Sequence, residues 1–359
     1  MKRILTIVGA RPQFIKAAAI SHAIRDMRDE IKEDILHTGQ HYDDAMSAQF
    51  FRELDIPQPR YNLGVGSGSH GAQTALMLKG IEETLQKEHY DGVLVYGDTN
   101  STLAGALAAV KLHVPVFHVE AGLRSYNREM PEEVNRVLTD HVSSLLFAPT
   151  DTAVQNLRKE GFDERSIVFS GDVMLDNVRH YAPHQNTTEK GERPCILATV
   201  HRDFNTDHPE RLKNILAALC NVAEKHNCDV LFPVHPRTRK RLESMDDAHV
   251  SGRIKMMAPL SYLETLAAVQ RSVLVMTDSG GLQKEAFFCG RCCVVLRPET
   301  EWTEIVDCGA ALLADADAEK IVDAADKLWD NIPCQPTQFG DGRAAVKIVK
   351  NITSFLLYK

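Results

Sequence analysis

Short apolar runs alternate with longer amphipathic stretches along most of the chain. Ile4 to Val8, Gly92 to Tyr96 and Val273 to Thr277 have the length and composition of buried strands. Ile15 to Met27 and Ser101 to Leu112 repeat apolar residues at helical spacing. Further strands are expected at residues 34–37, 114–119, 145–148, 195–200, 229–234 and 292–296, and a further helix at 208–225. This alternation predicts an α/β fold with parallel strands joined by crossover helices.

The pattern restarts halfway along the chain. Apolar content falls between Tyr181 and Pro194, and a new series of strands and helices begins at Cys195. A chain of 359 residues is long enough for two domains. We expect two Rossmann-like, doubly wound domains, residues 1–170 and 171–342, with a ligand cleft between them at the strand ends. A last helix at 343–359 is expected to pack back on the first domain.

Composition narrows the possible partners. The formal net charge of -8 gives no electrostatic reason to expect nucleic acid or an anionic membrane. No apolar stretch approaches the roughly 20 residues of a membrane helix, and the first apolar run is too short for a signal peptide. The eight cysteines are irregularly spaced, which favours reduced, buried thiols. We therefore expect a cytoplasmic globular protein.

The turn after the first strand carries two cations. Gly9-Ala10-Arg11-Pro12 is followed by Lys16 one helical turn later. Proline near the start of a helix presets the backbone, and the free amides there favour an anion. Arg11 and Lys16 are therefore candidate anion ligands, although an ordinary strand-to-helix turn with surface cations gives the same pattern.

Acidic residues follow the next strands. Asp98 comes just after residues 92–96, Glu120 just after 114–119, and Glu132 precedes Arg136 by one helical turn. Three carboxylates at neighbouring strand ends must titrate differently, which is the usual arrangement for acid-base chemistry. Asp98 taken alone is equally typical of a helix N-cap.

The second half offers polar groups of another kind. His201 and His235 each follow an expected strand, and Ser279 to Gly281 form a glycine-containing turn with Glu285 one helical turn further on. Two glycines let a diphosphate approach unpaired backbone amides. The alternatives are that the histidines are ordinary loop residues and that Glu285 lies on a solvated helix face. Because no spacing is typical of metal ligands, we expect neither a metal nor a cofactor.

Together these motifs closely resemble the non-hydrolysing UDP-N-acetylglucosamine 2-epimerases over nearly the whole chain. The matching segments are Gly9 to Pro12, Thr38 to His41, Tyr96 to Thr99, His118 to Arg124, Pro131 to Arg136, Thr199 to Arg202 and Asp278 to Glu285, followed by Glu301 and Glu304. The resemblance implies a glycosyltransferase-B type of fold, UDP and a UDP-sugar as ligands, and a homodimer.

The resemblance also implies the chemistry. UDP is eliminated across C1 and C2 to give a bound 2-acetamidoglucal and is then added back with C2 inverted. Breaking the bond from C1 to oxygen acidifies the C2 hydrogen enough for a positioned carboxylate to remove it. The implied catalytic residues are Asp98, Glu120, Glu132 and His201, and the implied substrate-binding residues are Arg11, Lys16, Arg136, His235, Ser279, Gly280, Gly281 and Glu285. Which carboxylate serves which face of C2 stays open.

Two segments depart from the family pattern. Ala10-Arg11-Pro12-Gln13 stands where the family has Thr-Arg-Pro-Glu, and Thr300-Glu301-Trp302-Thr303-Glu304 replaces Thr-Glu-Arg-Pro-Glu. Both changes resemble the branch that epimerises UDP-2,3-diacetamido-2,3-dideoxy-glucuronate for bacterial surface polysaccharide. We expect UDP-N-acetylglucosamine as the substrate, with this uronate as the alternative. Trp302 is expected to offer a flat apolar wall to the sugar.

Three further hypotheses for the function remain. They are a hydrolysing 2-epimerase, a glycosyltransferase on the same fold and a non-catalytic nucleotide-sugar binder. A transferase needs an acceptor site, for which the sequence offers no candidate. The binder is disfavoured because three acidic residues beside an anionic ligand repel it.

Overall fold

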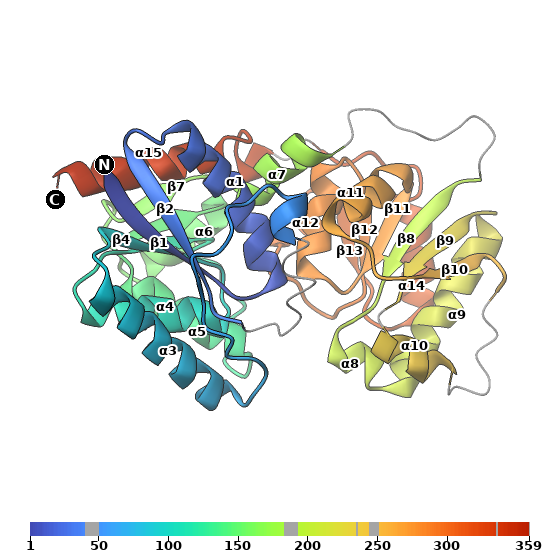
Figure 1. The fold of residues 1–359 in the computed structure, drawn as a ribbon. Coiled ribbons are helices and arrows are strands. Elements are labelled where there is room, and N and C mark those ends of the chain that lie inside the picture. Colours follow the sequence, from blue (N-terminus) through green and yellow to red (C-terminus); the bar gives the residue numbers. More distant parts are fainter. Residues whose placement is uncertain (40–49, 183–192, 235, 244–250, 335–336, 359) are drawn as a thin grey trace. The chain divides into compact units, whose positions relative to one another are not determined.

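The computed structural model describes residues 1–39, 50–182, 193–234, 236–243, 251–334 and 337–358 (Figure 1). The chain divides into two compact units, the first of residues 1–177 and 337–359 and the second of residues 178–336. From the sequence, the domain boundaries are expected after residues 170 and 342. Each unit contains a parallel sheet with helices packed on it, so the expected α/β fold is confirmed.

The first unit contains a seven-stranded sheet in the order β3-β2-β1-β4-β5-β6-β7. All of its neighbouring strands run parallel, and the chain reverses its direction of travel across the sheet between β1 and β4. The strands are β1 Lys2–Val8, β2 Ile31–His37, β3 Tyr61–Asn62, β4 Gly92–Tyr96, β5 Val116–Val119, β6 Leu145–Ala148 and β7 Ile167–Phe169. The helices are α1 Arg11–Asp26, α3 His70–Lys87, α4 Asn100–Lys111, α5 Pro131–Val142, α6 Asp151–Lys159, the 3-10 helix η1 Thr337–Phe339 and α15 Ala344–Tyr358, and α7 Val173–Tyr181 crosses the division between the units.

The second unit contains a six-stranded parallel sheet in the order β10-β9-β8-β11-β12-β13. Its strands are β8 Cys195–Thr199, β9 Asp229–Pro233, β10 Ile254–Met257, β11 Leu274–Thr277, β12 Cys292–Val295 and β13 Ala311–Leu313. Its helices are α8 Asp203–Thr206, α9 Pro209–Lys225, α10 Pro236–Glu243, α11 Tyr262–Arg271, α12 Gly280–Phe288, α13 Thr303–Asp307 and α14 Ala318–Leu328.

The central strands of both sheets are buried in apolar cores, as their apolar sequences predict. In the first unit, Ile7 and Val95 pack with Ala104 of α4 and Met77 of α3 in one core. In the second unit, Ile196 and Met276 pack with Leu219 of α9 in another. A parallel sheet with helices on its faces fixes its strand ends firmly, and those ends carry the polar motifs.

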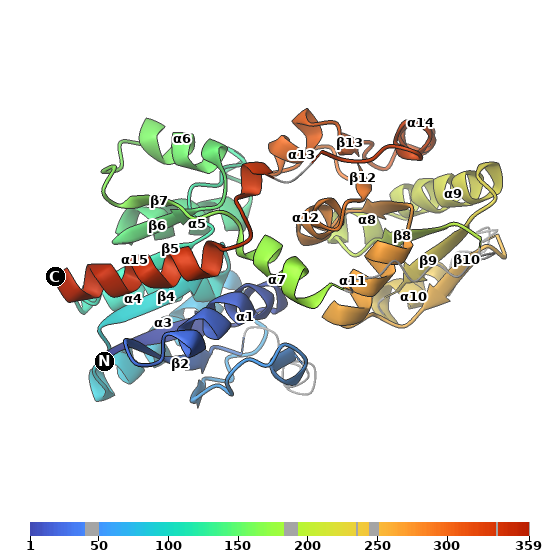
Figure 2. The ribbon, with the colours of Figure 1, turned by 90° about the horizontal axis from the view of Figure 1, so that it is seen from above.

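The last helix belongs to the first unit. Figure 2 shows α15 in red running beside α1 in blue, and the two helices are in contact. Asp176 of α7 caps α15, because its two carboxylate oxygens accept the amides of Ala344 at 3.1 Å and Ala345 at 2.8 Å. Burial raises the pKa of Asp176 to about 6, although these hydrogen bonds act in the opposite direction.

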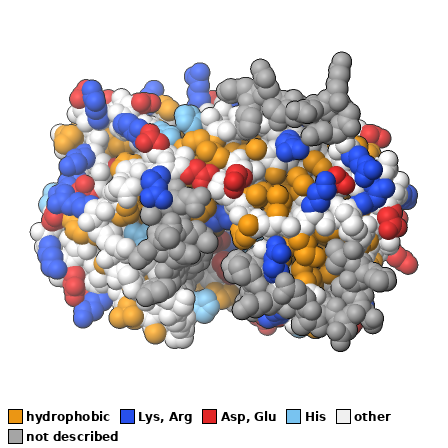
Figure 3. All heavy atoms as spheres, turned by 45° about the vertical axis from the view of Figure 1, so that its right-hand side comes forward, with side chains coloured by type: hydrophobic (Ala, Val, Ile, Leu, Met, Phe, Trp, Pro, Cys, Tyr) orange, Lys and Arg blue, Asp and Glu red, His pale blue; other side chains and the backbone are white. Residues whose placement is uncertain are grey.

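The surface shows no grouping of charge by sign on the face seen in Figure 3, where acidic and basic side chains are interspersed. None of the helices within the described ranges is long and apolar enough to cross a membrane. None of the eight cysteines forms a disulfide bond.

Candidate functional site

Two of the predicted site residues meet at the strand ends of the first unit. Lys16 of α1 forms an ion pair with Glu120, which follows β5, and both side chains are largely buried. Gly97 lies against this pair, because a Cβ atom on it would stand 3.0 Å from Lys16 Nζ and 3.2 Å from Glu120 Oε2. Gly97 also has a φ of 61°, so both space and backbone conformation favour glycine there.

Glu120 itself has an unusual backbone. Its φ is 71°, and its amide and that of Ala121 both donate to the Phe147 carbonyl at 3.1 Å. A left-handed conformation costs a residue with a Cβ about 1 kcal/mol or more, and such residues cluster at functional sites. The shared carbonyl of β6 holds the turn that aims this carboxylate.

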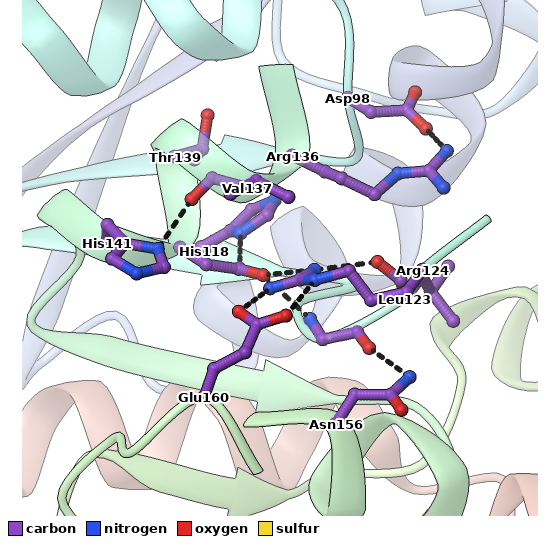
Figure 4. A network of polar contacts seen from close by, with 12 residues as sticks. Asp98, His118, Leu123, Arg124, Arg136, Val137, Thr139, His141, Asn156 and Glu160 are labelled. Carbon is purple, nitrogen blue, oxygen red and sulfur yellow. Dashed lines mark hydrogen bonds and ion pairs between the residues drawn. The ribbon is translucent and has the colours of Figure 1, made fainter. Parts of the chain in front are cut away.

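Asp98 is held by a second ion pair. Its Oδ2 accepts from Arg136 Nη2 of α5, and the Asp98 side chain remains 30% exposed (Figure 4). It does not cap α4, since Thr99 is the N-cap and its hydroxyl accepts the Thr102 amide at 3.3 Å. The cap alternative for Asp98 is therefore wrong, and its carboxylate is available for another role.

The two acids at the start of α5 differ. Glu132 is half-buried and has no hydrogen bond or ion pair to any residue that the structure describes. Glu133 is buried, and it accepts the amides of Ser125 at 2.9 Å and Tyr126 at 3.0 Å and pairs with Arg136 at 2.9 Å. Sequence reasoning missed Glu133, although its position three residues before Arg136 is typical of a helical ion pair.

Gln13 ties the first turn to the Asp98 turn. Its Oε1 accepts the amides of Gly9 at 2.8 Å and Ala10 at 3.1 Å, and its Nε2 donates to the Tyr96 carbonyl at 3.0 Å. A glutamate carboxylate lacks the N–H that makes this last bond. The glutamine that departs from the family pattern is thus a buried structural link. Arg11 stands beside it, half-buried, with its guanidinium 5.1 Å from the Phe50 ring.

In the second unit, a buried aspartate organises the loop after β8. Asp278 accepts the amides of His201 at 3.1 Å and Arg202 at 3.0 Å and the side chain of Asn205 at 3.1 Å. His201 Nδ1 stands 3.1 Å from Asp278 Oδ1, while half of the His201 side chain is exposed. Burial by itself raises the pKa of Asp278, but the hydrogen bond and charge of His201 and the other donors bring it below its usual range.

The start of α12 has the features expected of an anion site. Ser279 is its N-cap and accepts the Leu282 amide at 3.4 Å. A Cβ on Gly281 would meet no atom nearer than Ser279 Oγ at 4.0 Å, whereas one on Gly280 would collide with Glu301 Oε1. Glu285 is buried and does not lie on a solvated helix face. His235, like Gln40 and His41, lies outside the described residues.

The expectation for Trp302 is wrong. Its side chain is only 3% exposed, and Lys284 Nζ lies 3.9 Å from the ring centroid. The indole is therefore packed in the second unit beneath a cation and offers no open wall to a sugar. Its neighbour Thr300 donates to Gln283 of α12 at 2.7 Å, so this loop supports the helix that carries the anion site.

Comparison with known proteins now gives the family. A family profile described as UDP-N-acetylglucosamine 2-epimerase matches residues 23–353. The chain belongs to this family. The Pseudomonas aeruginosa protein named UDP-2,3-diacetamido-2,3-dideoxy-D-glucuronate 2-epimerase is 49% identical over 97% of this chain and 98% of its own. The UDP-N-acetylglucosamine 2-epimerase of Methanocaldococcus jannaschii is 42% identical over 97% of this chain and 98% of its own.

Solved structures agree. The Methanocaldococcus jannaschii UDP-GlcNAc 2-epimerase, in complex with UDP-GlcNAc and UDP, aligns with a TM-score of 0.88 and 41% identity over 99% of this chain and all of that one. A glycosyltransferase of kitacinnamycin aligns at 10% identity with a TM-score of 0.58, which shows the fold alone. The comparisons confirm the family and its isomerase chemistry expected from the sequence.

Proposed function

We propose that this enzyme inverts C2 of UDP-N-acetylglucosamine to give UDP-N-acetylmannosamine. The observation that carries the proposal is the pair of carboxylates at the ends of the neighbouring strands β4 and β5, each paired with a cation: Asp98 with Arg136 and Glu120 with Lys16. Two acids on adjacent strand ends suit a reaction that removes a proton from one face of a carbon and returns one to the other.

The proposed reaction has two halves. A carboxylate takes the C2 proton while the bond from C1 to the phosphate oxygen breaks, so its electrons leave with UDP and a C1–C2 double bond forms. UDP then adds back to C1 as a proton is delivered to the opposite face of C2. Glu132 is retained as a third candidate acid, and its half-buried carboxyl has no competing partner among the described residues.

Cations and amides meet the charge of the departing UDP in this proposal. Electrostatic stabilisation of a leaving diphosphate is the largest demand of the first half. The groups assigned to it are Arg11, Lys16, Arg136, His201 and the α12 turn of Ser279, Gly280 and Gly281, while Glu285 takes the ribose. The free amides of a helix start and the open space at Gly281 support the assignment of the turn.

A second candidate substrate is the UDP-linked 2,3-diacetamido-2,3-dideoxy-glucuronate. It is supported by the Pseudomonas aeruginosa relative named for this substrate, which is 49% identical to the chain. The UDP-N-acetylglucosamine 2-epimerase homolog of Methanococcus maripaludis has the same identity of 49%. Either product is an activated sugar suited to bacterial surface polysaccharide synthesis, which is part of the proposal.

The test is to incubate the enzyme with each UDP-sugar in deuterated water and to follow C2 by proton NMR. We expect an epimer and deuterium at C2 in both product and recovered substrate. Retained C2 hydrogen contradicts the elimination, release of free sugar and UDP indicates a hydrolysing enzyme, and binding without turnover indicates a binder. A tenfold preference in kcat/KM, about 1.4 kcal/mol, decides between the two sugars.

We also propose that the chain forms a homodimer through the helices α3 and α5, both of which pack on α4. Leu76 is 56% exposed, Val134 43% and Leu138 46%, so these two helices present large apolar side chains that a second copy could cover. Light scattering on Leu138→Asp should show a monomer. The control Leu313→Asp, at a residue with comparable exposure in the second unit, should keep the dimer; two monomers or two dimers contradict this interface.

A further inference from the structure

His118 lies in β5, two residues before Glu120, and neither the motif nor the proposed chemistry gives it a role. Its side chain is fully buried. Nδ1 is 2.7 Å from Asp140 Oδ1, and Nε2 is 2.7 Å from the Gly97 carbonyl oxygen. Figure 4 shows the ring between Thr139 and His141 of α5, which flank Asp140, and the loop that carries Arg124.

Both ring nitrogens therefore face acceptors. A backbone carbonyl has no proton to give. Asp140 is a carboxylate, because its other oxygen already accepts the Gly122 amide at 3.1 Å and pairs with Arg124 at 2.8 Å. A neutral imidazole has one N–H and would leave a lone pair against an oxygen at one of the two contacts. N–H groups on both ring nitrogens, as in an imidazolium, would satisfy both contacts.

The surroundings balance this buried charge. Asp140 lies between His118 and Arg124, and Glu160 accepts from Arg124 at 2.6 and 2.7 Å. With a protonated His118, two cations and two anions alternate in one network. Burial by itself raises the pKa of Asp140, but His118 and then Arg124 bring it below its usual range, which keeps the anion in place.

The bond to Gly97 acts on Asp98 through the backbone. The Gly97 carbonyl and the Asp98 amide belong to one planar peptide unit, so a donor on that oxygen fixes the orientation of the unit. The flanking units are fixed as well: the Tyr96 carbonyl accepts from Thr102 Oγ1 at 2.6 Å, and the Asp98 carbonyl accepts from Asn135 Nδ2 at 2.9 Å. Gly97, with its left-handed φ, has the greatest freedom of the three residues.

We propose that His118 is a positioning residue that, as a buried imidazolium, holds the Gly97–Asp98 peptide and thereby aims the Asp98 carboxylate at the substrate. This inference rests on the proposed role of Asp98. It goes beyond that role in naming the group that sets its direction and the charge state that this group must have.

The first test is spectroscopic and independent of turnover. In ¹⁵N-labelled enzyme at neutral pH, an unperturbed imidazole is mostly uncharged, whereas His118 should show protons on both ring nitrogens. The signal is assigned by its loss in His118→Gln. A single ring N–H on His118 overturns the proposal, whatever the activity of the enzyme.

The second test separates the two hydrogen bonds. The amide of His118→Asn reaches the Asp140 side and loses the Gly97 bond, whereas the longer His118→Gln keeps a donor for the Gly97 carbonyl. We expect the Asn variant to lose kcat by roughly tenfold to hundredfold with KM and UDP affinity unchanged, as misaimed catalytic groups do. The Gln variant should retain most of the activity.

Controls make the outcome unambiguous. His141→Asn changes an exposed histidine of α5, whose Nδ1 lies 2.9 Å from the Val137 carbonyl and whose ring packs against Phe162, and should leave kcat unchanged. Equal losses in His118→Asn and His118→Gln, or a loss that appears in KM alone, overturn the positioning role. If both variants unfold, the ring protons of the parent enzyme still decide the charge. A parent enzyme without epimerase turnover defeats the proposed function and leaves this spectroscopic result standing.

Discussion

The strand ends of the two units hold their polar groups in different ways. In the first unit, long charged side chains pair with one another across elements: Lys16 with Glu120, and Arg136 with Asp98 and Glu133. In the second unit, Asp278 accepts two backbone amides as well as the side chains of Asn205 and His201, and the start of α12 is built from Ser279 and two glycines. The first arrangement supplies groups that can exchange protons; the second supplies fixed dipoles.

The difference suggests a division of labour. A UDP group is the same in every substrate of the family, and backbone amides at a helix start bind a diphosphate without any side chain having to change its charge. The reacting carbon needs carboxylates whose charge changes during the reaction, and these need cations nearby. Side-chain substitutions should therefore affect turnover in the first unit and affinity in the second.

The largest effect is expected from the acids of the first unit. Asp98→Asn and Glu120→Gln remove the proton acceptors while keeping size, so kcat should fall by about a hundredfold or more. UDP affinity, measured by calorimetry, should stay the same. The exposed Glu129, changed to Gln, is the matched control and should retain full activity. Near-normal turnover in both acid variants would make the two ion pairs structural.

Much of the fold could be predicted from the sequence. Strands that are buried on both faces, such as β4 and β6, appear as continuous apolar runs with the bounds that the structure shows. The edge strands β3, β7, β10 and β13 were missed. They have two to four residues and only partial burial, so they leave little apolar signal.

The site was predicted less completely, and for a physical reason. Sequence spacing gives neighbours on one helix or one turn, whereas the contacts of Gln13 with Tyr96 and of His118 with Gly97 span 83 and 21 residues. They exist because β1, β4 and β5 are adjacent in the sheet. Residue type alone also mistook Trp302 for a surface residue, since burial beneath Lys284 depends on the loop that follows β12.

A second prediction concerns pH and the helix that closes the first unit. The folded pKa of Asp176 is about 6, whereas an unfolded aspartate has one of about 3.9. The folded state therefore binds the proton more tightly, and the stability linked to this group is greatest below pH ~4 and falls as pH rises to ~6. Relative to Asp176→Asn, the free energy of unfolding should drop by roughly 2 to 3 kcal/mol over that window.

Urea unfolding of both proteins across this pH range measures the difference. The control Asp341→Asn removes a more exposed carboxylate whose pKa is lowered by its hydrogen bond to Lys347, so the stability of the parent relative to this variant should show no such fall between pH ~4 and ~6. If the difference in unfolding free energy between the parent and Asp176→Asn does not change with pH, burial does not raise the pKa of Asp176. The second unit offers a contrast, because the pKa of its buried Asp278 is lowered by His201 despite burial.

A smaller effect is expected at the start of α12. Gly281→Val places a side chain where the structure has open space, so the fold should tolerate it while the diphosphate loses its close approach to the amides. UDP affinity should weaken by about tenfold, or ~1.4 kcal/mol, with the melting temperature little changed. Gly252→Val, also in open space but away from any site motif, is the control. Unchanged UDP binding would show that the diphosphate does not use this turn.

The smallest effect is predicted for Trp302, and it tests whether the second unit also contributes to recognition of the sugar. Because the indole is buried beneath Lys284, Trp302→Phe keeps an aromatic face for the cation and shrinks only the packing volume. Stability should fall by about 1 kcal/mol, as for a modest core change. The ratio of kcat/KM for UDP-N-acetylglucosamine and the diacetamido uronate should not move, since the buried indole exposes almost no surface to a sugar. A shift of tenfold or more in that ratio would show that the loop after β12 influences recognition of the hexose. The proposed division between a unit that binds UDP and a unit that carries the reacting groups would then be wrong for this loop.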